Sequence, residues 1–517
     1  MVLDNLGCIA SFPSLRAMSS SRESTGQIEQ PRASEEKVPG RSVAFIAADG
    51  PLEAPKPPDL EPGLIHSLPE ELLIAILDVL HLSEIDAEPD SPKIRLLVPT
   101  IACQVSSFWR QLALNHLLWW SYIYIAPPWK FDAIQAYLHR SGGCPLDVRI
   151  SVHHNYHALH EDGVELPSLE GYLHLGPILF PHLSRCRSLT FHGVFRDVEP
   201  LFPHLITPLI SLDMPHLEEL TIDCDFKRKH GDVTKPLFQS APRLFDVRLG
   251  GLSVASFRPP FSNIRSLHLS RATDNRNLSF LNLKDILASC ECLTTLAIYD
   301  DFLVTWPGME AERSCSVPLL ESLYILGNML AVSELLLFLS APNLRELVIA
   351  PVVAGDFTSL VPHADLSNGL PRFPALAQLT VAPAFSDTFN ETLPSASRCF
   401  PNVQTLILAN VYLVEFGQSL ADNPMTLFPK MENLALTDVD KAMARAVQLV
   451  AKVRKMRGSP LKNVYVDSDS VVKFMDVEDD WEGVNVQVAD LWENQRRKAM
   501  YRDVKDLFIG RPSDEIW

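Results

Sequence analysis

Four histidines at 153–160 form the part of the sequence most suggestive of metal chemistry: His153, His154, His157 and His160. On a helix, His153 and His157 would share one face with His160 nearby, and imidazole nitrogens are good zinc ligands. However, residues 148–152 alternate as a strand that runs into a loop, and no Asp or Glu stands at metalloprotease spacing. We therefore interpret the segment as a solvated loop, and a metal-dependent enzyme is the weakest of three functional hypotheses.

Other catalytic patterns are missing from the sequence. It has no Gly-x-Ser-x-Gly, no phosphate loop ending in Gly-Lys-Ser/Thr, no kinase motif set and no dinucleotide glycine fingerprint. The pair Cys290 and Cys292 has no second pair nearby, so it is a poor zinc signal. The sequence therefore predicts a protein that is not an enzyme and has no cofactor, metal site or catalytic residues.

Composition narrows the partners and the compartment. The chain has 517 residues and a net charge of −18, and phosphate contacts need a basic face, so nucleic acid is not expected as a partner. Two basic clusters, 226–230 and 452–457, are interpreted as solvated faces. Nine scattered cysteines indicate a reducing compartment, the cytoplasm or the nucleus. No apolar run reaches the roughly 18 residues of a membrane helix, so no membrane is expected either.

Two apolar stripes in residues 64–125 predict a pair of helices. The first starts at Pro69 with two acids, which suit a helix N-terminus, and the second follows an acidic insert at 84–93 that predicts a polar loop. The first stripe consists of Leu72, Leu73, Ile76, Leu77 and Leu80, and the second of Ile101, Val105, Phe108, Trp109 and Leu112.

This helical stretch resembles an F-box. The resemblance rests on the opening at 68–73 (LPEELL), the middle at 103–109 (CQVSSFW) and the close at Leu118 and Trp119. It implies that the helices bind a Skp-type adaptor and, through it, a cullin. Carried over to this sequence, the implied adaptor-binding residues are Leu68, Pro69, Leu72, Leu73, Ile76, Leu77, Val105, Trp109 and Leu112. About half of them are expected to face the core of the helical domain instead, as is Trp119.

From residue 181 the chain repeats a Leu-x-x-Leu-x-Ile unit. The first residue of each unit, here called the anchor, recurs about every 27 residues, within the range of leucine-rich repeats. The anchors are Cys186, Leu217, Leu244, Ile264, Leu293, Leu320, Leu344, Leu376, Val403, Met431 and Leu461. The last two apolar residues of a unit lie two apart, as in a short strand, and stretches such as 281–289 and 332–339 predict outer helices. No copy can hide its apolar face alone, so the copies must stack.

The predicted fold is therefore α/β: a small helical F-box-like domain followed by a leucine-rich-repeat solenoid with a parallel inner sheet. Its parts are a disordered tail (1–62), the F-box-like domain (63–126), a helix–strand junction (127–180), the solenoid (181–475), and an acidic segment with a terminal helix (476–517).

The whole resembles a fungal F-box protein with C-terminal leucine-rich repeats. That family implies a substrate-recognition subunit of a Skp–cullin–F-box ubiquitin ligase, whose repeats bind an unidentified protein target. The alternative is a non-catalytic leucine-rich-repeat scaffold that binds no adaptor. Target specificity is expected at positions flanking the strands, such as Arg265, Thr294, Tyr324 and Gln404.

Overall fold

The computed structural model describes the part of the chain that lies within one compact unit, Leu68–Trp517. The described residues are 68–86, 98–126, 130–152, 169–194, 207–225, 235–251, 257–270, 280–299, 314–327, 332–353, 355–362, 371–383, 388–408, 427–437, 439–475, 481 and 483–489. The predicted tail at 1–62, the histidines at 153–160, the basic cluster at 226–230 and the terminal helix beyond residue 489 lie outside them.

The N-terminal described elements are helical. They are α1 (Glu70–Asp86), α2 (Val98–Val105), α3 (Ser107–Asn115) and the 3-10 helix η2 (Leu117–Trp120). The second apolar stripe predicted one helix, but the structure divides it at Ser106. Ser106 has an extended backbone, and its hydroxyl accepts a hydrogen bond from the N–H of Trp109 at 3.2 Å. It is therefore an N-cap that starts a new helix.

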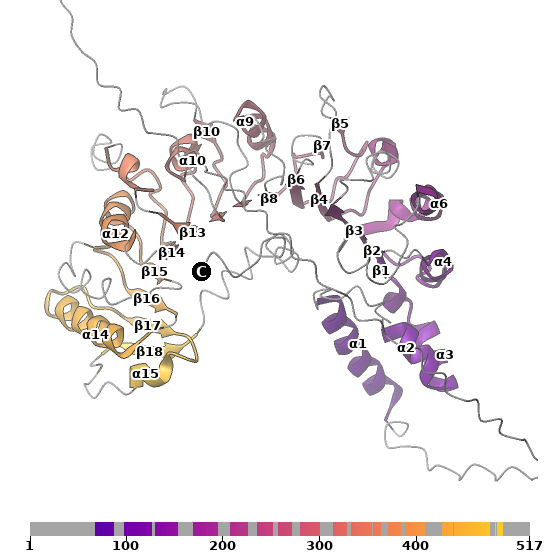
Figure 1. Cartoon of the computed structure of the whole chain (residues 1–517), viewed down its shortest axis with the longest axis horizontal. Coiled ribbons are helices and arrows are strands. Elements are labelled where there is room, and N and C mark those ends of the chain that lie inside the picture. Colours follow the sequence, from indigo (N-terminus) through magenta and orange to yellow (C-terminus); the bar gives the residue numbers. More distant parts are fainter. Residues whose placement is uncertain are drawn as a thin grey trace, which may run out of the picture. The chain divides into compact units, whose positions relative to one another are not determined.

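A single parallel sheet of 14 strands follows, and its strands lie side by side in chain order (Figure 1). They are β1 (Tyr122–Ile125), β2 (Leu146–Val152), β3 (Cys186–Val194), β4 (Glu219–Asp225), β6 (Asp246–Gly251), β8 (Ser266–Ser270), β9 (Thr295–Tyr299), β11 (Ser322–Leu326), β13 (Glu346–Val352), β14 (Gln378–Pro383), β15 (Thr405–Leu408), β16 (Asn433–Leu436), β17 (Asn463–Val466) and β18 (Asn485–Val488). The α/β class and the solenoid-like parallel sheet are thus confirmed. The sheet also extends beyond the predicted 181–475 limits at both ends.

Helices cover one face of this sheet. They are α4 (Phe131–Arg140), α6 (Leu169–Leu179), α9 (Phe280–Ser289), α10 (Val332–Phe338), α12 (Thr388–Cys399) and α14 (Lys441–Met456), all on the same side in Figure 1. Shorter elements are η3 (Phe180–Arg185), η4 (Thr207–Ser211), η6 (Thr358–Leu360), α15 (Val471–Met475) and two small sheets, β5 (Lys235–Pro236) with β7 (Phe257–Arg258) and β10 (Cys315–Ser316) with β12 (Leu339–Ser340). We call the opposite face of the large sheet the inner face.

The hydrophobic core lies between the sheet and these helices. Leu323 of β11 pairs in register with Leu296 of β9 and Leu347 of β13, and all three are fully buried. Burying such a side chain contributes about 1.5–3 kcal/mol. Successive side chains of a strand point to opposite faces of the sheet, so one residue faces the core and the next faces the inner face.

A tight turn precedes each anchor and adds an apolar position that the repeat pattern did not include. The N–H of Leu293 bonds to the carbonyl of Cys290, that of Leu320 to Val317, and the same step recurs in most copies. The first residue of the turn is buried; examples are Met214, Ala241, Phe261, Cys290, Val317, Ala341, Phe373, Phe400 and Phe428. The turn aims each strand in the same direction, so that successive copies stay in register.

One member of the basic cluster at 452–457 differs from its predicted solvated position. Arg454 of α14 is fully buried, and its guanidinium donates to several backbone carbonyls, including that of Met431 at 3.0 Å. These carbonyls belong to the turn of the preceding copy, so Arg454 ties two copies together. Lys452, Lys455 and Arg457 are exposed as predicted.

Among the described residues, no helix combines the length and the apolar character needed to cross a membrane.

Removing one core strand residue should destabilise the sheet. We expect Leu323→Ala to lower the free energy of unfolding by about 2–5 kcal/mol, because the side chain is fully buried and leaves a cavity. Leu281→Ala on α9 is the control, since Leu281 is 68% exposed and should change stability by less than about 0.5 kcal/mol. Thermal unfolding followed by circular dichroism measures both. Equal losses for the two variants would contradict the placement of Leu323 in the core.

Candidate functional site

The N-terminal helices have a hydrophobic core of their own. Its buried members are Leu73, Leu77, Val98, Ala102, Leu112, Ala113 and Trp119. The indole N–H of Trp119 donates to Asp78 Oδ1 at 2.6 Å, which fixes η2 against α1. The three helices and η2 thus pack around a hydrophobic cluster that is separate from the main core of the sheet.

The structure divides the nine predicted adaptor-binding residues between the inside and the outside of this cluster. Leu73, Leu77 and Leu112 are buried in it, and Leu68 and Trp109 are partly buried. The exposed members are Pro69, Leu72, Ile76 and Val105. The buried residues hold the helices together, so only the exposed ones are free to contact a partner.

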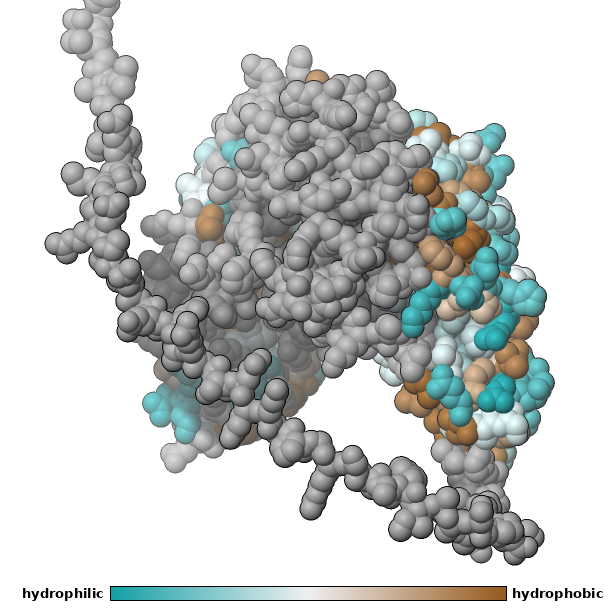
Figure 2. Space-filling view, turned by 45° about the vertical axis from the view of Figure 1, so that its right-hand side comes forward, coloured by the Kyte–Doolittle hydropathy of each residue, from teal (hydrophilic) through white to brown (hydrophobic). Residues whose placement is uncertain are grey.

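Further exposed apolar side chains extend this outer set. Spacing places Leu72, Ile76, Val79 and Leu80 on one face of α1. With the exposed residues of α2 and α3 they form what we call the apolar helical surface: Leu72, Ile76, Val79, Leu80, Ile101, Val105 and Phe108, with exposures between 43% and 67%. Figure 2 shows brown, apolar atoms on the lower right-hand side, where α1–α3 lie in Figure 1. Exposed apolar patches of this kind mark interaction sites.

The helical cluster is joined to the start of the sheet through Trp120. Its indole N–H donates to the carbonyl of Ala113 at 2.7 Å, and its ring meets Tyr137 of α4 edge-on, with centroids 4.9 Å apart. The guanidinium of Arg140 lies 4.4 Å from the Trp120 ring centroid. Thr100 of α2 and the Tyr137 hydroxyl share a hydrogen bond of 2.9 Å. These contacts hold the apolar helical surface in a fixed position relative to β1 and α4.

The inner face of the sheet is built from in-register rows of side chains. One row is polar along its whole length and consists of Asp147, Ser188, Glu219, Asp246, Ser266, Thr295, Ser322, Glu346, Gln378, Thr405, Asn433, Asn463 and Asn485. Side chains bond along it, as from Gln378 Nε2 to Glu346 Oε1 at 2.7 Å and from Asn463 Nδ2 to Asn433 Oδ1 at 2.8 Å. These bonds satisfy polar groups where the strands begin.

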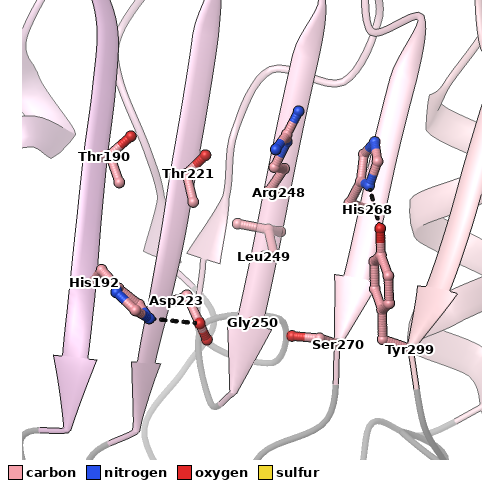
Figure 3. A pocket seen from close by; sticks show the side chains of 10 residues that line it. All are labelled: Thr190, His192, Thr221, Asp223, Arg248, Leu249, Gly250, His268, Ser270 and Tyr299. Carbon is pink, nitrogen blue, oxygen red and sulfur yellow. Dashed lines mark hydrogen bonds and ion pairs between the residues drawn. The ribbon is translucent and has the colours of Figure 1, made fainter. Parts of the chain in front are cut away.

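A small pocket lies deeper on the inner face, across strands β3 to β9 (Figure 3). Its cavity volume is about 30 Å³, and its lining includes His192, Asp223, Arg248, His268 and Tyr299. Each comes from a different copy of the repeat, so no linear motif could have revealed the pocket. The signal in the sequence is only the set of mostly polar residues at the fourth and sixth positions after each anchor.

The positive groups of the pocket are neutralised. Arg248 donates to both carboxylate oxygens of Asp246, from Nε to Oδ1 and from Nη2 to Oδ2, each at 3.2 Å. His268 bonds through Nδ1 to the Tyr299 hydroxyl at 2.9 Å and through Nε2 to Ser266 Oγ at 3.0 Å. Burial, and then the nearby Arg248, lower the pKa of His268 to about 3, so this imidazole is uncharged near neutral pH. Burial also raises the pKa of Tyr299, which keeps its proton.

A glycine leaves room for the Asp223 carboxylate in the wall of the pocket. A Cβ on Gly250 would lie 2.1 Å from Asp223 Oδ1 and 2.7 Å from Ser270 Oγ, closer than atoms can approach. Any side chain at position 250 would therefore displace the Asp223 carboxylate. On its other side, Asp223 Oδ2 lies 3.3 Å from His192 Nε2.

The residues expected to flank the strands and set specificity are not the ones that line this pocket. Arg265 and Gln404 are exposed, and Thr294 is partly buried, each just before a strand. Tyr324 is 3% exposed, and its hydroxyl donates to Glu346 Oε2 at 2.9 Å. The histidines at 153–160 lie outside the described residues. Within the described part, no group of His, Cys, Asp and Glu side chains has the arrangement of a metal site.

No protein-family model matches the sequence, and no curated protein is significantly similar to it. Function must therefore be argued from the sequence pattern and from two surfaces of the structure, the apolar helical surface and the inner-face pocket.

The buried, uncharged His268 should make stability depend on pH. In the unfolded chain a histidine binds a proton below about pH 6.5, but folded His268 resists protonation until about pH 3. The unfolded state therefore binds more protons in this window, and stability falls as the pH drops from 6.5 toward 3, by up to about 1.4 kcal/mol per pH unit.

His268→Gln should lack this contribution. We expect its free energy of unfolding to fall less steeply than that of the wild type between pH 6.5 and 4, measured by chemical denaturation at each pH. Parallel pH profiles for the two proteins would show that His268 is protonated in the folded state.

Proposed function

We propose that the protein is a substrate receptor of a Skp–cullin–F-box ubiquitin ligase. Helices α1–α3 are its F-box, and the repeating strands with their outer helices are leucine-rich repeats that hold a protein target. One observation carries the proposal: α1–α3 have a closed core of their own and still expose apolar side chains from Leu72 to Phe108. A face of that kind is favourable only when a partner covers it.

The exposed side chains would contribute favourably to docking. Leu72, Ile76 and Val105 are 54%, 45% and 51% exposed, so a partner that covers one of them gains roughly half of the about 1.5–3 kcal/mol that full burial of a fully exposed side chain contributes. A few such residues at the centre of an interface account for most of its binding energy. The motif residues at 68–73 that resemble an F-box opening lie on this same segment.

The inner face supports the receptor part of the proposal. Solenoid sheets present a broad surface on which side chains from many copies meet, and such surfaces bind proteins. The contacts of Trp120 and Tyr137 link this surface to the adaptor-binding helices without a flexible joint. A receptor of this design contributes proximity: it brings the target near the ubiquitin-carrying partner that the adaptor and cullin hold. This role places the protein in the cytoplasm or the nucleus.

The alternative is a scaffold in which the helices only cover the first strand. The bond between Thr100 and Tyr137 and the stacking of Arg140 on Trp120 favour such a capping role as well. Capping uses the side of the helices that faces α4, however, and leaves Leu72 and Ile76 exposed. Adaptor binding therefore separates the two functions.

Charging the apolar helical surface should abolish adaptor binding. We expect the double variant Leu72→Glu and Ile76→Glu to bind the Skp adaptor at least about 100-fold more weakly, because two apolar contacts are lost and two charges are desolvated. Its fold should persist, since both residues are exposed. The dissociation constant is measured by titrating purified adaptor into the full chain.

The matched control is Leu281→Glu, which charges an exposed leucine on α9, outside the helical cluster. It should bind the adaptor like the wild type. Wild-type protein that binds no adaptor would favour the scaffold, and equal affinity of the double variant would remove the apolar helical surface from the interface.

A further inference from the structure

Within the described part of the chain, a partly buried carboxylate oxygen of the inner-face pocket has no hydrogen-bond donor. Asp223 is 19% exposed and contacts His192 through Oδ2. Among the described residues, none donates a hydrogen bond to its Oδ1, which lies over Gly250 in the hollow of the pocket. A carboxylate with little solvent around it is stabilised by a donor, most strongly by a charged one. The pocket therefore favours a ligand that brings a donor to Oδ1.

The charge balance of the lining favours a cation over an anion. Arg248 is bound by both oxygens of Asp246, and the two side chains are only 11% and 7% exposed. His268 is uncharged, and His192 adds positive charge only when it is protonated. A phosphate or carboxylate ligand would thus meet the Asp223 carboxylate without a free positive group to offset it.

The size of the hollow selects among cations. A cavity of about 30 Å³ holds one or two water-sized groups, and a primary ammonium group is of that size, whereas a planar guanidinium is larger. An ammonium has three donors. Near Asp223, the pocket also offers the hydroxyl group of Ser270 as an acceptor (Figure 3).

We propose that this pocket binds the ammonium group of a lysine side chain of the target protein. Asp223 accepts from the ammonium through Oδ1, and Gly250 leaves the space that the Asp223 carboxylate needs to hold this position. This inference rests on the proposed function in one respect, which is that the lysine belongs to a target protein of the receptor. The preference of the pocket for lysine is a property of the inner face itself.

A peptide library tests this preference. The full-length protein is incubated at pH 8 with an array of acetylated nonapeptides in which each amino acid in turn, including acetyllysine and phosphoserine, is fixed at the centre. We expect enrichment of lysine over arginine, acetyllysine and phosphoserine. The strongest lysine peptide is then compared in solution with the same peptide carrying norleucine, which keeps the alkyl chain and lacks the ammonium.

The variant Asp223→Asn, tested with the lysine and norleucine peptides, completes a double-mutant cycle between Asp223 and the ammonium group. In the wild type, norleucine in place of lysine should weaken binding at least tenfold. In Asp223→Asn, the lysine peptide should bind at least tenfold more weakly than to the wild type, and the norleucine change should have little further effect. Asp285→Asn removes an equal charge from an exposed position on α9 and should behave like the wild type. Gly250→Ala should also lose the preference, because its Cβ displaces the Asp223 carboxylate.

The outcomes distinguish this inference from the proposed function. The variant with Leu72→Glu and Ile76→Glu should keep the lysine preference while it loses the adaptor, and Asp223→Asn should keep the adaptor. A library without lysine enrichment, a preference for phosphoserine, or an Asp223→Asn protein that still prefers lysine to norleucine overturns the inference, whatever the adaptor does.

Discussion

In-register pairing between neighbouring copies of the repeat is the interaction on which the whole structure depends. A copy supplies one short strand and an outer segment, and its apolar strand residues are buried only when the next copy stacks on it. Leu323 of β11 is fully buried because paired leucines flank it on both neighbouring strands. These are Leu296 on β9 and Leu347 on β13. Because all strands are parallel and in register, every inner-face row extends from copy to copy, and the pocket on β3–β9 is a consequence of that alignment.

The helical cluster also consists of leucine-rich segments, but only some of its apolar side chains are buried. Leu73 and Leu77 on one side of α1 hold the three helices together, while Leu72 and Ile76, one residue earlier in each pair, remain exposed. A helix turns by about 100° per residue, so one of two neighbouring apolar residues can be buried while the other stays exposed. This explains why a stretch so rich in leucine is not entirely buried, and it leaves an apolar surface for the proposed adaptor.

The sequence allowed the periodic features to be predicted, because burial imposes them on every copy. The anchors, the strands after them, and helices such as α9 and α10 are found where the pattern placed them. Non-periodic features could not be predicted in this way. The break at Ser106 depends on one capping hydroxyl, and the burial of Arg454 depends on carbonyls of the preceding copy.

The candidate sites also could be predicted from the sequence only in part. The resemblance pointed to residues 68–119 as the proposed adaptor-binding segment, but which side of α1 is exposed follows from packing against Val98, Leu112 and Trp119. The pocket joins residues from separate copies, such as His192, Asp223 and His268, and a glycine whose importance lies only in what approaches it. No local sequence motif reveals that these residues lie close together in the fold.

Hydrogen exchange with and without the Skp adaptor tests the central claim most directly, because it reports which backbone segments a partner covers. The account predicts added protection in α1–α3, residues 70–86 and 98–115, and unchanged exchange in strands β3–β17. No added protection at saturating adaptor, or protection confined to the inner face, would contradict it.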